Sequence, residues 1–314
     1  MKLVLGHSSR WANHRQRLSA RFELAIDLLR EAKIFAEERD AAAISRQDIE
    51  SAFRGRRERK RGHFFQMIEE TLHHRTIVHT EGAVIGQVNA LTVLTSFDNT
   101  YGFPARVTAR TYAAKDGIVS IERSIEMSGA IQNKGIMILS GFLNGLLGQD
   151  YPLSFGCSLA FEQMYVPIDG DSASVAGLLA VLSALAQVPI QQNIAITGSV
   201  DQWGHLQAIG GVHQKIEGFY ELCKARGFTG QQGVLVPESN CFDLVMTDEI
   251  VCSVQKVEFH IWAARHIEDV TPLLLNMPLY PTAKKRKKEE RSDSIIDRIK
   301  KRLCEYSKLL RSEE

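Results

Sequence analysis

The sequence predicts a mixed α/β fold of the α+β type, with a helical segment before it and a basic helix after it. Three segments alternate between apolar and polar residues and predict strands, at 87–95, 105–111 and 118–125. Two apolar stretches with small residues at helical spacing predict buried helices, at 135–147 and 173–186. Short apolar runs at 194–197 and 233–236 lie beside helical stretches, which is typical of βα units in a mixed sheet.

The helical segment before this body begins with a hairpin. Apolar residues recur at helical spacing from about Leu18 to Phe53. Ser45 and Asp48 have the order of a capping box at the start of the second helix, with aspartate in place of the usual glutamate or glutamine. The basic stretch at 54–62 predicts a solvated helix extension or a linker. We therefore expect a helical segment and linker over residues 1–78.

The body ends where the composition changes. Pro278 and Pro281 precede a basic run at 284–291, which leads into an amphipathic helix. Its apolar residues fall on one side of the helix, where they can pack within the chain or join subunits: Ile295, Ile296, Ile299, Leu303, Tyr306, Leu309 and Leu310. We expect the α/β body to occupy residues 79–277 and the basic helical tail to occupy residues 278–314.

Composition limits the class of protein. The 314 residues include 38 basic and 37 acidic side chains, so a net charge of +1 provides no overall field for nucleic acid or membrane. Five widely spaced cysteines without a CxxC pair suit a reducing compartment and argue against a zinc site. No apolar run reaches the ~18 residues of a membrane span, and no signal-peptide pattern opens the sequence. We expect a soluble, cytoplasmic protein without a metal.

Ser172 has the setting of a nucleophile. It follows Asp169-Gly170-Asp171, where glycine permits a strained turn, and it precedes a long apolar helix. Amide groups at the start of that helix would face the reacting centre and could hold an oxyanion, an effect worth roughly 3–4 kcal/mol per donor. An ordinary turn with a helix N-cap explains the same residues.

Lys215 is the candidate base. It lies just inside a predicted helix that follows Gly210-Gly211, among apolar neighbours. To act near neutral pH its pKa must fall by about three units, which burial can cause at a cost of roughly 4 kcal/mol. Thr197 could orient the neutral amine by hydrogen bonding. The alternative is a solvated helix lysine.

Taken together, these motifs resemble the proteolytic domain of Lon proteases over about residues 82–275. The residues that carry the resemblance are Asp169-Gly170-Asp171-Ser172-Ala173, Thr197-Gly198, Gly210-Gly211 with Lys215, and Val234 through Pro237 to Asn240. The forms Gly170-Asp-Ser-Ala-Ser174 and Thr197-Gly-Ser199 are similar to the archaeal-type branch and its bacterial relatives, although Gln132 stands where that branch commonly has histidine.

The resemblance implies a fold like the second domain of ribosomal protein S5 and a serine endopeptidase with a Ser172–Lys215 dyad. It also implies that Thr197 supports the lysine, that Asp169 lies beside the dyad, and that a hexameric ring degrades unfolded or damaged polypeptides in protein quality control. The N-terminal helices resemble the lid of an AAA+ ATPase, but no GxxxxGK[ST] motif occurs. ATP and Mg²⁺ are therefore implied only for an intact module, and we expect a fragment or a shortened relative that uses no cofactor itself.

Several alternatives stay open. His205 or His213 could form a Ser–His arrangement, Cys157 could be a thiol nucleophile instead of a small buried residue, and Glu122 and Glu126 are expected on the solvated face of a strand. The basic runs Arg54–Arg61 and Lys284–Arg291 could make a weak DNA contact, although interleaved acids reduce their field. A catalytically silent, Lon-like scaffold is the remaining reading.

Overall fold

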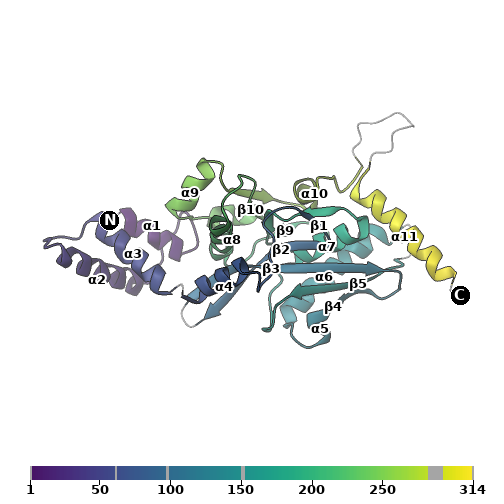
Figure 1. Cartoon of the computed structure of the whole chain (residues 1–314), viewed down its shortest axis with the longest axis horizontal. Coiled ribbons are helices and arrows are strands. Elements are labelled where there is room, and N and C mark those ends of the chain that lie inside the picture. The colour runs from purple at the N-terminus through teal and green to yellow at the C-terminus, as the bar shows by residue number, and fades with distance from the viewer. Residues whose placement is uncertain (1, 61, 97–98, 150–152, 282–292, 313–314) are drawn as a thin grey trace.

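The computed structural model describes residues 2–60, 62–96, 99–149, 153–281 and 293–312 of the chain (Figure 1). The N-terminal helices lie at one end of the long axis and the C-terminal helix lies at the other, with the sheet between them. The basic run predicted at 284–291 falls outside the described residues.

The N-terminal segment contains the predicted hairpin. Its helices are α1 (Lys2–Trp11), α2 (Phe22–Glu38), α3 (Arg46–Lys60) and α4 (Gly62–Leu72). α2 and α3 bury a small apolar core between them, made of Leu28, Ala32, Ile49 and Ala52. The capping box is confirmed, because the Ser45 amide donates to the Asp48 carboxylate at 2.7 Å and the Asp48 amide donates to the Ser45 hydroxyl at 3.3 Å.

The basic stretch after residue 53 continues α3 up to Lys60, as a helix extension. Two of its arginines point back to α2, where Arg56 and Arg59 both pair with Glu31. Their hydrogen bonds lower the pKa of Glu31 against the opposing effect of its burial. The positive charge of this stretch is therefore partly neutralised within the segment.

A seven-stranded mixed sheet forms the centre of the body. The strand order is β11 (His260–Ala264), β10 (Gly233–Pro237), β7 (Ile194–Ile196), β2 (Gln87–Ser96), β3 (Asn99–Tyr112), β5 (Gly156–Glu162) and β4 (Gly117–Ser120). β2 pairs antiparallel with β3, and β3 with β5, whereas β11, β10, β7 and β2 run parallel to one another. Two small sheets pair β1 (Ala83–Ile85) with β6 (Pro189–Gln191) and β8 (Ser199–Val200) with β9 (Leu206–Gln207).

Two helices cover opposite faces of this sheet. α7 (Ser174–Ala186) is buried along its whole length and packs with Ala90, Ile196 and Leu235. α8 (Val212–Arg226) packs with the alternate residues of the same strands, Leu91, Ala195 and Val234. Since successive strand residues point to opposite faces, the two clusters lie on the two sides of the sheet. α6 (Ala130–Leu147), α9 (Asp248–Gln255), α10 (Ile267–Leu275) and a 3₁₀ turn at Glu238–Asp243 complete the body.

The C-terminal helix α11 (Ile295–Arg311) packs inside the same molecule. Its apolar side joins the core cluster that contains α7, through Ile295, Ile296, Ile299 and Leu303. The Tyr306 hydroxyl lies within hydrogen-bond distance of Thr111 on β3. This part of the predicted stripe therefore packs within the chain, whereas Leu309 is 56% exposed.

One predicted strand is wrong in its second half. Only residues 118–120 of the segment 118–125 lie in a strand, β4, because Ser120 accepts a hydrogen bond from the Arg123 amide and caps a short helix, α5 (Ile121–Ser124). Glu122 is therefore buried, and its carboxylate accepts the Phe161 amide at 2.6 Å and the Ser120 hydroxyl at 3.1 Å. Glu126 is exposed, in a left-handed turn after the helix with φ 59°. The two glutamates do not share a strand face.

Candidate active site

The turn that carries Ser172 is anchored on one side by Asp169. The Asp169 Oδ1 atom accepts hydrogen bonds from the amides of Ile131, Gln132 and Gly170, at 3.0, 3.1 and 2.9 Å. These bonds lower the pKa of Asp169, the Gln132 amide contributing most. Gly170 follows with φ +109°, a conformation that L side chains rarely adopt. Asp169 thus caps the start of α6 and fixes the turn.

The other side of the turn is tied to the end of β7. The Ser172 carbonyl accepts the Gly198 amide at 2.7 Å and the Thr197 hydroxyl at 3.1 Å. The Gly198 carbonyl in turn accepts the amide of Val175, in the first turn of α7. Because Thr197 directly follows β7, these bonds hold Ser172 at the carboxyl end of a central strand.

Lys215 reaches Ser172 from the opposite face of the sheet. Its Nζ lies 2.7 Å from the Ser172 Oγ and 3.1 Å from the Thr197 Oγ1. Thr197 therefore contacts both halves of the pair, since its hydroxyl donates to the serine carbonyl and accepts from the lysine. The three residues that sequence reasoning connected, Ser172, Lys215 and Thr197, lie together in the structure.

Burial sets the chemistry of this lysine. Lys215 is 1% exposed, and the loss of solvation lowers its pKa to about 8, against an opposing effect of Asp171. A pKa near 8 leaves a usable fraction of neutral amine at physiological pH, so the amine can accept a proton from a hydroxyl at 2.7 Å.

A glycine contact lets α8 approach the sheet closely enough for this distance. A Cβ placed at Gly218 would lie 1.9 Å from the Gly102 carbonyl oxygen on β3, and one at Gly102 would lie 2.0 Å from the Gln214 carbonyl oxygen. Side chains at either position would force the helix and strand apart. The pair of glycines therefore places the helix of Lys215 directly on β3.

Asn240 holds the loop that leads into α8. Its Oδ1 accepts the Ile209 amide at 3.0 Å, and its Nδ2 donates to the Ile209 carbonyl at 2.9 Å and to Asp243 at 2.8 Å. The side chain is 1% exposed. The sequence motif singled out Asn240 without giving it a task, and the structure assigns it the support of the Ile209–Gly211 loop.

The alternative nucleophile and bases lie elsewhere. Within the described residues, neither His205 nor His213 hydrogen-bonds Ser172: His205 is exposed beside Asp201, and His213 contacts Asn13 and the Val245 amide. Cys157 is fully buried, and burial raises its pKa to about 12, so it packs as an apolar residue. Gln132 is buried in α6. These contacts favour lysine over histidine as the partner of Ser172.

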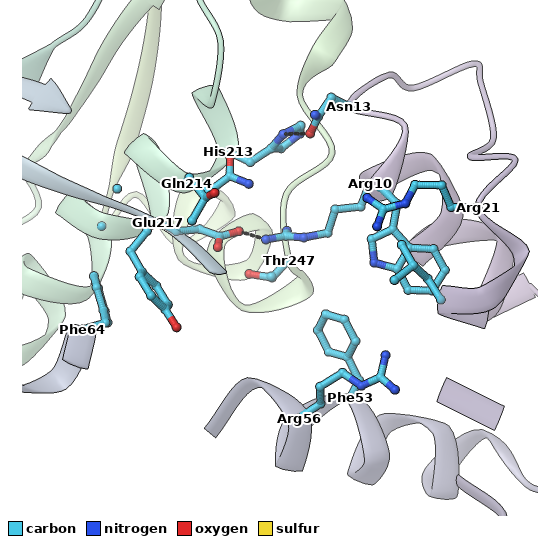
Figure 2. A pocket seen from close by; sticks show the side chains of 16 residues that line it. Arg10, Asn13, Arg21, Phe53, Arg56, Phe64, His213, Gln214, Glu217 and Thr247 are labelled. Carbon is cyan, nitrogen blue, oxygen red and sulfur yellow. Dashed lines mark hydrogen bonds and ion pairs between the residues drawn. The ribbon is translucent and has the colours of Figure 1, made fainter. Parts of the chain in front are cut away.

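A cavity of about 460 Å³ lies between the N-terminal helices and α8 (Figure 2). Arg10, Trp11 and Phe53 line it from the N-terminal segment, and Gln214 and Glu217 line it from α8. Neither Ser172 nor Lys215 lines this cavity. It lies on the outer side of α8, the helix that carries Lys215.

Two family models match parts of this chain. Residues 160–277 match the Lon protease (S16) C-terminal proteolytic domain, and residues 1–59 match the AAA+ ATPase LID domain of archaeal LonB. A protein of Escherichia coli (strain K12) named "Putative Lon protease homolog" is 40% identical over 252 residues, which cover 80% of this chain and 43% of that protein. The chain belongs to the Lon protease family.

Other Lon relatives give the same result. A protein of the same name from Haemophilus influenzae is 35% identical over 284 residues, covering 88% of this chain and 46% of that protein. The archaeal Lon protease of Thermoplasma volcanium is 32% identical over 225 residues, covering 70% of this chain and 32% of that protein. The chain thus spans less than half the length of these curated relatives. Within the described residues, no helix is both long and apolar enough to cross a membrane.

Proposed function

We propose that this chain is a serine endopeptidase of the Lon type that hydrolyses peptide bonds in unfolded polypeptides. Ser172 is the nucleophile, Lys215 is the general base, and Thr197 orients the lysine. The observation that carries the proposal is the buried Lys215 Nζ at 2.7 Å from the Ser172 Oγ, with a pKa lowered to about 8. A serine and a neutral lysine at hydrogen-bond distance form a nucleophile and base without histidine.

The reaction proceeds in two halves. Neutral Lys215 takes the Ser172 proton while the serine oxygen attacks the peptide carbonyl, and the resulting ammonium returns a proton to the leaving amine. This step leaves an acyl-enzyme and a free amino terminus. A water molecule then attacks the ester, Lys215 accepts its proton, and Ser172 recovers that proton as the carboxylic acid leaves.

The oxyanion of each tetrahedral intermediate has a candidate site at the start of α7. Within the described residues, the amides of Ser172 and Ala173 donate no hydrogen bond, although they precede the first turn of the helix. Donors of this kind stabilise a developing negative charge, typically by about 3–4 kcal/mol each. Asp169 serves this arrangement as a support of the turn rather than through contact with Lys215.

No nucleotide step is assigned to this chain, because its sequence contains no GxxxxGK[ST] loop to hold ATP phosphates and Mg²⁺. From family membership we propose a hexameric ring, a cytoplasmic location and a role in protein quality control. Light scattering checks the ring, since a mass equal to one chain contradicts it. No observation favours the scaffold or DNA reading as a second function, and the Arg56 and Arg59 ion pairs weaken the DNA reading.

The test is cleavage of unstructured casein and of a fluorogenic peptide without ATP. Wild-type protein is compared with Ser172→Ala and Lys215→Ala, and His205→Ala serves as the control for a Ser–His mechanism. We expect activity in wild type and His205→Ala and loss in both dyad variants. Full activity of either dyad variant would overturn the assignment. A serine-directed fluorophosphonate probe extends the test to single turnovers, because it reports the reactivity of Ser172 directly.

A further inference from the structure

The outer side of α8 is held by the N-terminal segment. His213 and Glu217 lie one turn apart on this helix, and Lys215 lies between them in sequence and on the opposite side. Figure 2 shows that His213 points to Asn13 and Glu217 points to Arg10, across the edge of the cavity. Both residues that flank the lysine are thus fixed by residues that lie 200 and 207 positions away in the sequence.

The His213 contact has only one arrangement of protons. The Val245 amide donates to the His213 Nε2 at 2.8 Å, so this nitrogen is an acceptor. The ring is neutral because it is buried and its pKa is lowered, first by burial and then by Arg10, against Glu217 and Asp243. The proton therefore lies on Nδ1, which donates to the Asn13 Oδ1 at 3.1 Å.

The N-terminal side of this contact is itself well defined. Asn13 lies just after α1 with φ 50°, a left-handed conformation that asparagine tolerates better than most residues. Arg10 forms a partly buried ion pair with Glu217 and donates to the Val245 carbonyl at 3.3 Å. Arg15 binds the same loop, through its backbone to Phe242 and through its side chain to Leu244.

The loop before α8 is rich in glycine, so the contacts of Asn13 and Arg10 with this helix matter for its position. Gly210 and Gly211 precede the helix, and glycine restrains the backbone less than any other residue. Support for the first turn of α8 therefore comes from packing and side chains, with Asn240 on the loop and with Asn13 and Arg10 on the outer face.

We propose that the N-terminal helical segment positions the catalytic base: Asn13 and Arg10, acting through His213 and Glu217, hold the first turns of α8 so that Lys215 stays buried against Ser172. These four are positioning residues, and the inference rests on the proposed dyad. When either contact is removed, α8 loosens and water reaches Lys215, so the lysine pKa rises toward its ordinary value of 10.5.

The experiment follows fluorophosphonate labelling of Ser172 against pH in the full chain. The variants are Asn13→Ala and Arg10→Met. Arg56→Met is the matched control, because the side chains of Arg10 and Arg56 are 19% and 21% exposed and each pairs with a glutamate, but Arg56 pairs within the N-terminal segment. A rise of one unit in the Lys215 pKa lowers the neutral amine about tenfold near pH 7. We expect labelling about tenfold slower there, recovering near pH 10, and a wild-type profile for Arg56→Met.

Hydrogen exchange measures how firmly the N-terminal segment holds α8, without depending on catalysis. The Lys215 amide donates to the Gly211 carbonyl at 3.0 Å in the first turn of α8, so a peptide covering 209–218 reports on this turn. We expect faster exchange of this peptide in Asn13→Ala and Arg10→Met and unchanged exchange in Arg56→Met. Unchanged exchange in both test variants, or an unshifted pH profile, would overturn the inference. Failure of the wild-type protein to label at Ser172 would contradict the proposed dyad instead. Hydrogen exchange alone would then decide whether the N-terminal segment holds the first turns of α8.

Discussion

Replacing Lys215 by methionine should stabilise the fold near neutral pH, although it removes the proposed base. Lys215 is 1% exposed, and its pKa falls from 10.5 to about 8 in the folded chain. That difference corresponds to about 3 kcal/mol by which folding disfavours the charged form. Two hydrogen bonds, to Ser172 and Thr197, are lost with the amine and offset roughly 1 kcal/mol of the gain. We expect Lys215→Met to raise the free energy of unfolding by about 2 kcal/mol near pH 7.

The pH dependence gives the sharper test. The unfolded chain keeps the Lys215 proton up to about its ordinary pKa of 10.5, whereas the folded chain releases it near 8. Between these values the unfolded state binds more protons, so the wild-type free energy of unfolding rises with pH. The advantage of Lys215→Met must therefore shrink through this interval. Above it, the two lost hydrogen bonds should leave the variant about 1 kcal/mol less stable than wild type.

Urea denaturation followed by circular dichroism measures both quantities. Lys224→Met is the control on the same helix, because Lys224 is half exposed and its hydrogen bond to Glu249 raises its pKa. That variant should be less stable than wild type near neutral pH, and the difference should fade only as pH rises through the raised pKa. A constant difference between Lys215→Met and wild type from pH 7 to 10.5 would refute the buried, depressed lysine.

Three further predictions concern the framework. Gly218→Ala places a Cβ 1.9 Å from the Gly102 oxygen, so it should lower the free energy of unfolding by about 1–3 kcal/mol and slow Ser172 labelling. Gly145→Ala is the control in α6, where nothing lies within 4 Å of the added Cβ. It should keep the free energy of unfolding and the Ser172 labelling rate at least at wild-type levels. Equal stabilities of the Gly218→Ala and Gly145→Ala variants would contradict the close approach of α8 to β3. Asn240→Ala leaves the amide and the carbonyl of Ile209 without their partner, so it should lower the free energy of unfolding by about 1–3 kcal/mol and slow Ser172 labelling. Asn193→Ala is the control: it loses one hydrogen bond to Gln231, and its Ser172 should label at the wild-type rate. Leu303→Ala should lower the free energy of unfolding, measured by thermal unfolding, by about 2–5 kcal/mol, because Leu303 is 1% exposed. Leu309→Ala on the same helix should lower it by less than about 0.5 kcal/mol, because Leu309 is 56% exposed. A reversed order of the two variants would mean that α11 does not pack as described.

Much of the site could be predicted because its signals are local. The Asp169–Ala173 turn, the glycines before Lys215 and the threonine after a short apolar strand each form a compact sequence pattern, and the structure brings them together at the end of β7. The helical hairpin and its capping box were also predictable, since helical spacing and side-chain capping act within a few residues.

What the sequence missed depends on contacts between distant residues or on one local competition. His213 read as an alternative base, because nothing near it in the sequence reveals that Asn13 and Val245 occupy both ring nitrogens. At residues 118–125 the alternation of apolar and charged residues suggested a strand throughout. Ser120 was the available signal to the contrary, since a serine that caps a helix stops the strand and turns Glu122 inward.

The packing of the two terminal helical regions has a practical consequence. The segment around α1 rests on α8, which carries Lys215, while α11 rests on α7, which begins just after Ser172. Each extremity of this molecule therefore packs on a different one of the two helices (Figure 1). A fluorophore placed near Arg15 would sense the environment of the lysine helix, and one placed near Arg311 would sense that of the serine helix. Measured as a pair, the two fluorophores would report separately on the two helices whose meeting brings Lys215 to the Ser172 hydroxyl.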